Sequence, residues 1–184
     1  MSAGQLQPPG LDAVRHYRLA RKYFLHSLDR PRLVSRAYPH IRSFLAKHPD
    51  NFEGLILAGY VAGEIDSRHA EALRYFDRAA RIRPRSHDPV EERANALLGW
   101  GRPREAIAPA LRALRMAERQ KLRGQALEFV YDVTVSALVE GGRTREAARL
   151  LRRGLRKMRS GLLRSLIPRY ARQWSAGRQS FGPR

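Results

Sequence analysis

Six histidines and 17 acidic residues are the side chains of this 184-residue chain that suit acid–base or metal chemistry, and there is no cysteine. The lack of cysteine excludes disulfides, thiol nucleophiles and cysteine-ligated zinc or iron–sulfur sites. The histidines are His16, His26, His40, His48, His69 and His87. No pair of them has the H-E-x-x-H arrangement or another recognised metal spacing. We therefore interpret them as surface or packing residues.

Glu91 and Glu92 form an acidic pair that could suggest general acid–base catalysis. They closely follow Asp88, however, and carboxylates near a helix N-terminus interact favourably with the helix dipole, while an Asp can cap the first turn. This pattern favours a helix start capped by Asp88. Apart from Gly141-Gly142 the glycines occur singly, so the chain has no glycine-rich phosphate loop. The sequence thus predicts no catalytic residue, no metal site and no cofactor, and the protein is not expected to be an enzyme.

The elements that must position these side chains are helices. Apolar residues recur at spacings of three and four, and no run of alternating Val, Ile or Thr indicates a strand. The expected helices cover residues 12–28, 33–47, 52–62, 68–83, 89–99, 103–120, 125–140, 144–159 and 161–175. The fold class is therefore predicted to be all-α, with tails at 1–11 and 177–184.

Two segments repeat one phrase, Gly101-Arg-Pro-Arg-Glu-Ala106 and Gly142-Arg-Thr-Arg-Glu-Ala147. In both, a glycine ends one helical pattern and polar residues open the next. Upstream, Ala72 and Ala37 occupy the position of the repeated alanine at spacings of 34 and 35 residues, and Pro84 and Pro49 each follow twelve residues later. A period near 34 with paired helices predicts a solenoid of helical hairpins.

The repeat resembles the tetratricopeptide family. Ala72-x-x-x-Phe76 followed by Pro84 is similar to the second half of that motif, and His48-Pro-Asp-Asn51 resembles the turn that joins two such repeats. The resemblance implies a right-handed α-α superhelix over residues 12–160, with units at about 12–49, 50–84, 85–120 and 125–159. Residues 161–176 are then expected to form a C-terminal capping helix. It also implies a non-catalytic scaffold for protein–protein interaction.

Positive charge dominates the composition, with 36 Lys plus Arg, of which four are Lys, against 17 Asp plus Glu. The formal net charge is +19, and residues 143–184 hold 13 cations and a single acid, Glu146. The 43% content of hydrophobic residues is that of a folded domain. A solvated outer face explains such a surplus, and so does a surface that binds RNA or another polyanion, for example within a ribonucleoprotein.

Repeat registration places arginines at matching positions of successive second helices, six and nine residues after the repeated alanine. Arg suits anion binding because its planar fork contacts phosphate or carboxylate groups bidentately. With the C-terminal cations, the candidate polyanion-binding residues are Arg78, Arg81, Arg112, Arg115, Arg145, Arg149, Arg152, Arg153, Arg156, Arg164, Arg169 and Arg172.

The first helices carry acids and aromatic residues instead. In the tetratricopeptide family these helices line the concave groove, so the resemblance implies a groove for a basic or apolar peptide. Its candidate contacts are Glu53, Tyr60, Asp88, Glu91, Asn95, Phe129 and Asp132. Of the side chains by which some such domains hold a chaperone's C-terminal carboxylate, only Asn95 has a counterpart.

Localisation is expected to be cytoplasmic, because the N-terminus lacks a signal-peptide pattern and the longest weakly polar run, 54–63, is about half a membrane span. Helix 161–175 has one apolar and one basic face. That pattern fits a cap on the last repeat, and it also fits a helix lying on an anionic membrane. Pro168 and the otherwise uncovered last repeat favour the cap.

Overall fold

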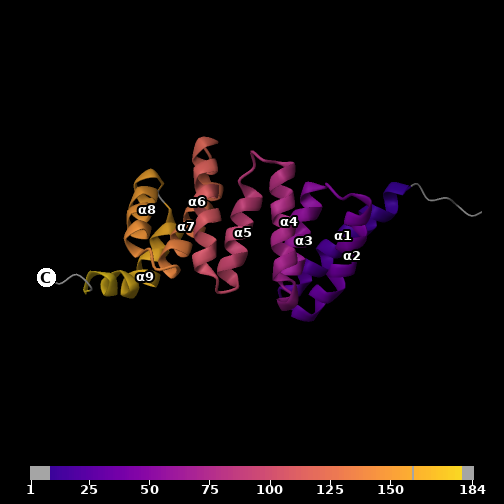
Figure 1. Ribbon diagram of the computed structural model, residues 1–184, viewed down its shortest axis with the longest axis horizontal. Coiled ribbons are helices and arrows are strands. Elements are labelled where there is room, and N and C mark those ends of the chain that lie inside the picture. The colour runs from indigo at the N-terminus through magenta and orange to yellow at the C-terminus, as the bar shows by residue number, and fades with distance from the viewer. Residues whose placement is uncertain (1–8, 159, 180–184) are drawn as a thin grey trace, which may run out of the picture. The chain divides into compact units, whose positions relative to one another are not determined.

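A computed structural model of the chain describes residues 9–158 and 160–179, with side chains over 12–158 and 160–171. Within these residues the chain is helical and has no strand, which confirms the all-α class. The α-helices are α1 (Pro9–Ser27), α2 (Val34–Lys47), α3 (Phe52–Gly63), α4 (His69–Ile82), α5 (Asp88–Gly99), α6 (Pro103–Arg119), α7 (Gly124–Glu140), α8 (Thr144–Lys157) and α9 (Gly161–Gln179) (Figure 1). Short 3₁₀ turns, Pro31–Leu33 and Asp66–Arg68, lead into α2 and α4. None of the helices described is long and apolar enough to cross a membrane.

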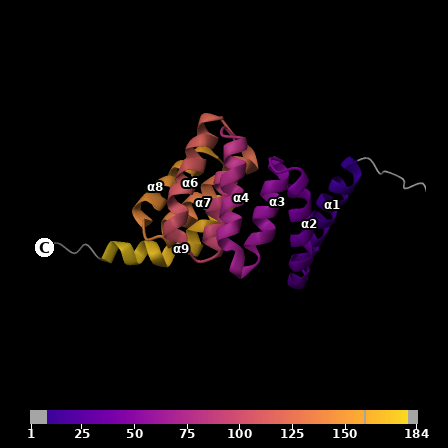
Figure 2. The same cartoon turned by 45° about the vertical axis from the view of Figure 1, so that its right-hand side comes forward.

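The chain divides into two compact units, one ending at Pro84 and the other starting at Arg85. In the first unit, successive helices pack side by side, α1 on α2, α2 on α3 and α3 on α4 (Figure 2). Glycines on α3 allow the close approach. A Cβ atom on Gly59 would lie 2.4 Å from the Phe76 ring of α4, and one on Gly54 would lie 2.6 Å from the Phe44 ring of α2. Only glycine therefore admits both rings to this core.

A polar network also joins α2 to α4. Glu71 accepts hydrogen bonds from Tyr38 at 2.8 Å and Tyr75 at 2.9 Å, and Arg68 contacts both Tyr38 and Glu71. Partial burial pushes the pKa of Glu71 up, but the hydrogen bonds from Tyr38, Tyr75 and Arg68 together hold it below its ordinary value. The two second helices of this unit are thus linked through an ionised carboxylate.

In the second unit, the repeated phrase builds the same joint twice. Gly101 and Gly142 adopt positive φ angles of 68° and 87°, conformations that favour glycine. The following amide nitrogens, of Arg102 and Arg143, donate back to carbonyls five residues earlier at 2.8 and 2.7 Å, as in a Schellman helix end. Both arginines then form two hydrogen bonds to the Glu three residues later. The repeated segment is therefore a helix-to-helix connector in which the first Arg and the Glu form an ion pair with each other.

The hairpins of both units close on small residues. Ala72, Ala106 and Ala147 are fully buried, as the repeat registration predicts, and they lie on the second helices of the pairs α3–α4, α5–α6 and α7–α8. Helices can pack closely only where side chains are small, so these alanines mark the hairpin contacts.

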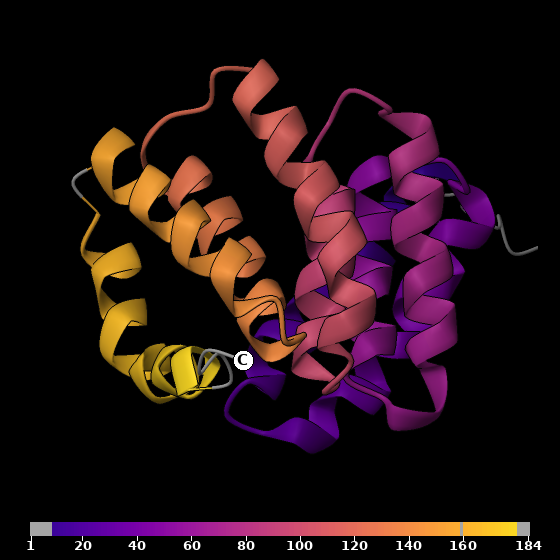
Figure 3. The same cartoon turned by 60° about the vertical axis from the view of Figure 1, so that its left-hand side comes forward.

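The last helix, α9, packs against α7 and α8 (Figure 3). Its Leu163, Leu166 and Tyr170 are buried, while Leu162 and Ile167 are 41% and 43% exposed. The Tyr170 hydroxyl hydrogen-bonds to Ser136 and Glu140 of α7. Part of the apolar arc of α9 therefore covers the α7–α8 hairpin, which is the packing that a capping helix requires.

Candidate functional site

The twelve candidate arginines lie in different surroundings. Arg78 and Arg153 form ion pairs with Asp50 and Glu118, each at 3.0 Å. The Arg169 guanidinium lies 5.2 Å from the centre of the Tyr170 ring. Within the described part of the chain, the remaining arginines that are exposed and make no ion pair are Arg81, Arg112, Arg115, Arg149, Arg152, Arg156 and Arg164. Arg145 is exposed and has a polar or electrostatic partner, and the side chain of Arg172 lies outside the described residues.

Three of these arginines line one hollow of about 340 Å³ between α6 and α8. Its apolar lining consists of Leu111 and Leu114 of α6, Leu138 of α7 and Leu150 of α8; its polar lining consists of Arg115, Glu118, Glu146, Arg149 and Arg153. We call this hollow the α6–α8 groove. It lies between two second helices and brings Arg115 together with Arg149 and Arg153. Repeat registration instead aligns Arg115 with Arg156, and Arg112 with Arg153.

Both acids of the α6–α8 groove are already satisfied. Glu118 accepts a hydrogen bond from the Tyr131 hydroxyl at 2.7 Å and pairs with Arg153 at 3.0 Å. Glu146 pairs with Arg143 of the helix joint at 2.6 Å. Arg115 and Arg149 therefore face the groove without a counter-charge among the described residues. The α6–α8 groove thus combines an apolar lining with an excess of positive charge.

The predicted first-helix contacts are less available than the sequence indicated. Glu53 is paired with Arg83 at 2.9 Å, and Tyr60 is half-buried between the rings of Phe24 and Phe76. Asp132 is half-buried, and burial raises the pKa of its carboxyl. Two further residues, Asn95 and Phe129, are exposed, the Phe129 ring at 40%.

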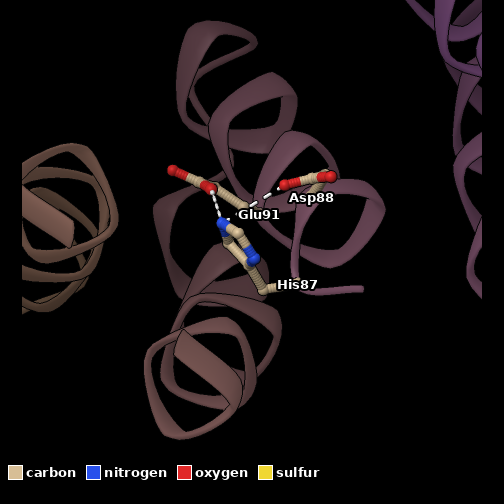
Figure 4. A group of neighbouring side chains, drawn as sticks. All are labelled: His87, Asp88 and Glu91. Carbon is tan, nitrogen blue, oxygen red and sulfur yellow. Dashed lines mark ion pairs between the residues drawn. The ribbon is translucent and has the colours of Figure 1, made fainter. Parts of the chain in front are cut away.

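Asp88 and Glu91 lie with His87 in a compact cluster at the start of α5 (Figure 4). His87 Nε2 is 3.2 Å from Asp88 Oδ1 and 3.5 Å from Glu91 Oε2. Asp88 does not cap the helix as predicted, because it is the first residue of α5 and the capping position belongs to His87. Burial first, and then the charges of Glu92 and Asp88, raise the pKa of Glu91 from 4.5 to about 8.

The spacing between histidines does not reveal this cluster, because only one of its three residues is a histidine. The available signal was His87-Asp88-x-x-Glu91 across a helix start, where residues i, i+1 and i+4 turn back on one another. A second histidine contact supports the packing interpretation for two more of them: His16 and His40 join α1 to α2 with their Nδ1 atoms 2.9 Å apart.

Two comparisons with known proteins, against family models and against curated proteins, assign no family to the chain. No protein-family model matches the chain, and no curated protein matches it significantly.

Proposed function

We propose that the protein is a non-catalytic scaffold of tetratricopeptide-like hairpins that binds an acidic peptide segment of a partner protein in the α6–α8 groove. The observation that carries the proposal is the pairing pattern in the groove. Glu118 and Glu146 are neutralised by other residues, whereas Arg115 and Arg149 are not. Carboxylate or phosphate groups of a ligand would supply the missing charge through bidentate contacts.

The lining of the groove favours a peptide over nucleic acid. The apolar part of the lining consists of Leu111, Leu114, Leu138 and Leu150. Apolar side chains of a peptide would bury surface against these leucines, while its acidic side chains would contact the arginines of the same groove. Nucleic acid recognition through single strands instead uses aromatic stacking platforms, and none of the residues lining the groove is aromatic.

Fluorescence anisotropy measurements with a set of labelled synthetic peptides test the proposal. The probes are labelled peptides that alternate Glu and Leu, together with matched peptides that carry Gln in place of Glu. The double variant Arg115→Gln/Arg149→Gln should bind the acidic peptides about tenfold more weakly, the equivalent of roughly 1.4 kcal/mol. The matched control, Arg18→Gln/Arg21→Gln, removes the same charge from exposed positions of α1 and should bind as the wild type does.

Equal weakening by both double variants would show non-specific attraction to the net charge and would overturn the groove assignment. The second candidate function is the binding of RNA or another polyanion to the exposed arginines of α6 and α8. The observation that favours it is that Arg112, Arg152 and Arg156 are exposed and make no ion pair among the described residues. For duplex nucleic acid, log K falls with log salt by about 0.9 per neutralised phosphate. Reversing the charge of Arg112, Arg152 and Arg156, which do not line the α6–α8 groove, should then flatten that slope for nucleic acid. The same variant should leave the binding of acidic peptides in the groove nearly unchanged.

A further inference from the structure

We propose that His87, Asp88 and Glu91 bind a divalent transition-metal ion, zinc in preference to the others. The three side chains come from the segment that leads into α5 and from the first turn of that helix. Their potential ligand atoms, one imidazole nitrogen and two carboxylate oxygens, all lie within 4.8 Å of one another. Figure 4 shows the imidazole edge turned toward both carboxylates.

The two separations between the imidazole nitrogen and the carboxylate oxygens match those around a tetrahedral ion. Zn²⁺ binds nitrogen and oxygen ligands at about 2.0–2.2 Å, which places neighbouring ligand atoms about 3.3–3.6 Å apart. His87 Nε2 lies 3.2 Å from the Asp88 oxygen and 3.5 Å from the Glu91 oxygen. A single Nε2–H can serve one acceptor well, so an ion pair alone does not explain two carboxylates placed around one nitrogen.

An independent observation is the burial of Glu91. Glu91 is the only charged residue among the buried residues described, its side chain is 7% exposed, and its Oε1 atom is buried without a hydrogen-bond partner. A buried carboxylate without compensation is costly, and metal coordination is one of the arrangements that relieve the cost. The other oxygen of this carboxylate, Oε2, is the one turned toward His87, the nitrogen ligand of the proposed site (Figure 4).

The pairing of the other acidic residues also supports a metal ion at this site. Seven other acids, Asp12, Asp50, Glu53, Glu71, Glu105, Glu118 and Glu146, pair with Lys or Arg. Among the described residues, neither Asp88 nor Glu91 has such a partner, in a chain with 36 cations. When both carboxylates are ionised they carry a charge of −2, which a divalent ion neutralises.

The donor set narrows the choice of ion. An imidazole nitrogen disfavours Mg²⁺ and Ca²⁺, which take oxygen ligands, and the lack of thiolate disfavours the softest ions. Ser86 supports the arrangement because its hydroxyl donates to Asp88 Oδ2 at 2.8 Å and so leaves Oδ1 directed at His87. Such outer contacts orient metal ligands in many sites. With three protein ligands, a fourth position is open to water or another ligand.

The test is a titration of the untagged full chain with Zn²⁺ by calorimetry, repeated with Co²⁺ to record the visible bands of a tetrahedral site. One equivalent should bind, and Zn²⁺ should raise the melting temperature. His87→Gln and Glu91→Gln should each weaken this binding more than the roughly 10–100-fold typical of lost outer-shell contacts, and Ser86→Ala should fall within that range. His48→Gln, which changes an exposed histidine, is the matched control.

Circular dichroism checks that each variant is folded, and Asp88→Asn offers a second ligand variant at an exposed position if a change at buried Glu91 prevents folding. A wild type that binds neither ion would overturn the proposal. So would Zn²⁺ binding that persists unchanged in His87→Gln, or binding that is lost equally in His48→Gln. Peptide binding in the α6–α8 groove is measured separately, so either proposal can fail without the other.

Discussion

Replacement of Glu91 by Gln should stabilise the metal-free protein increasingly as the pH rises. Burial, with the nearby charges of Glu92 and Asp88, raises the pKa of Glu91 to about 8 in the folded state, against 4.5 for an ordinary Glu. His87 is the other titratable group that faces the carboxylate. Unfolding returns Glu91 to water and to its ordinary pKa, so the two states bind its proton with different affinity.

The sign and size of the effect follow from this difference. A raised folded-state pKa favours folding below the unfolded value of 4.5, and that contribution is lost as the pH rises through about 8. Each pKa unit is worth about 1.36 kcal/mol, so the difference between 4.5 and about 8 corresponds to roughly 5 kcal/mol. About 3.5 kcal/mol of it falls between about pH 5 and pH 8. Gln does not titrate, so the free energy of unfolding of Glu91→Gln should gain on the wild type by up to that amount.

Urea denaturation followed by far-UV circular dichroism, with a chelator present, measures the two free energies across this range. Glu105→Gln is the control, because the Glu105 carboxylate is exposed and a hydrogen bond from Arg102 lowers its pKa. Its contribution to stability is complete above the ordinary pKa, so its curve should run parallel to that of the wild type from about pH 5 upward. Parallel curves for the wild type and Glu91→Gln would refute the reasoning that Glu91 is buried and protonated in the folded protein.

Two further predictions concern the second unit. Gly154→Ala should destabilise it by about 1–2 kcal/mol, because the new Cβ would lie 2.7 Å from the buried ring of Tyr131 and overpacking outweighs the gain in helix propensity. Gly99→Ala, where nothing lies within 4 Å, should instead stabilise by up to about 1 kcal/mol; equal melting temperatures would contradict the packing described. Deletion of residues 161–184 should lower the melting temperature and expose apolar surface to a hydrophobic dye. A truncated protein that melts as before but no longer sediments with anionic vesicles would favour the membrane interpretation of α9.

The helices and their joints could be predicted from the sequence because their signals are local. The phrase that begins at Gly101 contains a left-handed glycine, a helix start and an Arg–Glu pair three residues apart, and each acts within one turn. The bounds of α6 and α8 agree with their apolar spacing for the same reason.

The pairing of charges could not be predicted in the same way. Arg112 and Arg153 occupy the same repeat position, yet Arg153 has a partner in Glu118, which lies 35 residues away in sequence. Glu118 was therefore missed, although it links α6, Tyr131 of α7 and α8. Likewise, the three residues of the His87 cluster are close in sequence, but the burial of Glu91 depends on tertiary packing. Sequence shows where charges are, whereas packing decides which of them are neutralised.

Among the described residues of the second unit, the α6–α8 groove and the start of α5 both hold charges that no Lys, Arg, Asp or Glu of the chain pairs with, and the two sites have opposite signs. At the two helix connections, Glu105 pairs with Arg102 and Glu146 pairs with Arg143. Between α6 and α8, Glu118 pairs with Arg153. That pairing leaves positive charge in the α6–α8 groove, because its acids already have partners. At the start of α5 the situation is reversed, since the carboxylates of Asp88 and Glu91 face an imidazole and no described Lys or Arg pairs with them. In the groove an anionic peptide would supply the missing negative charge through bidentate contacts to Arg115 and Arg149. At the start of α5 a divalent cation would supply the missing positive charge, and it would relieve the cost of burying the Glu91 carboxylate.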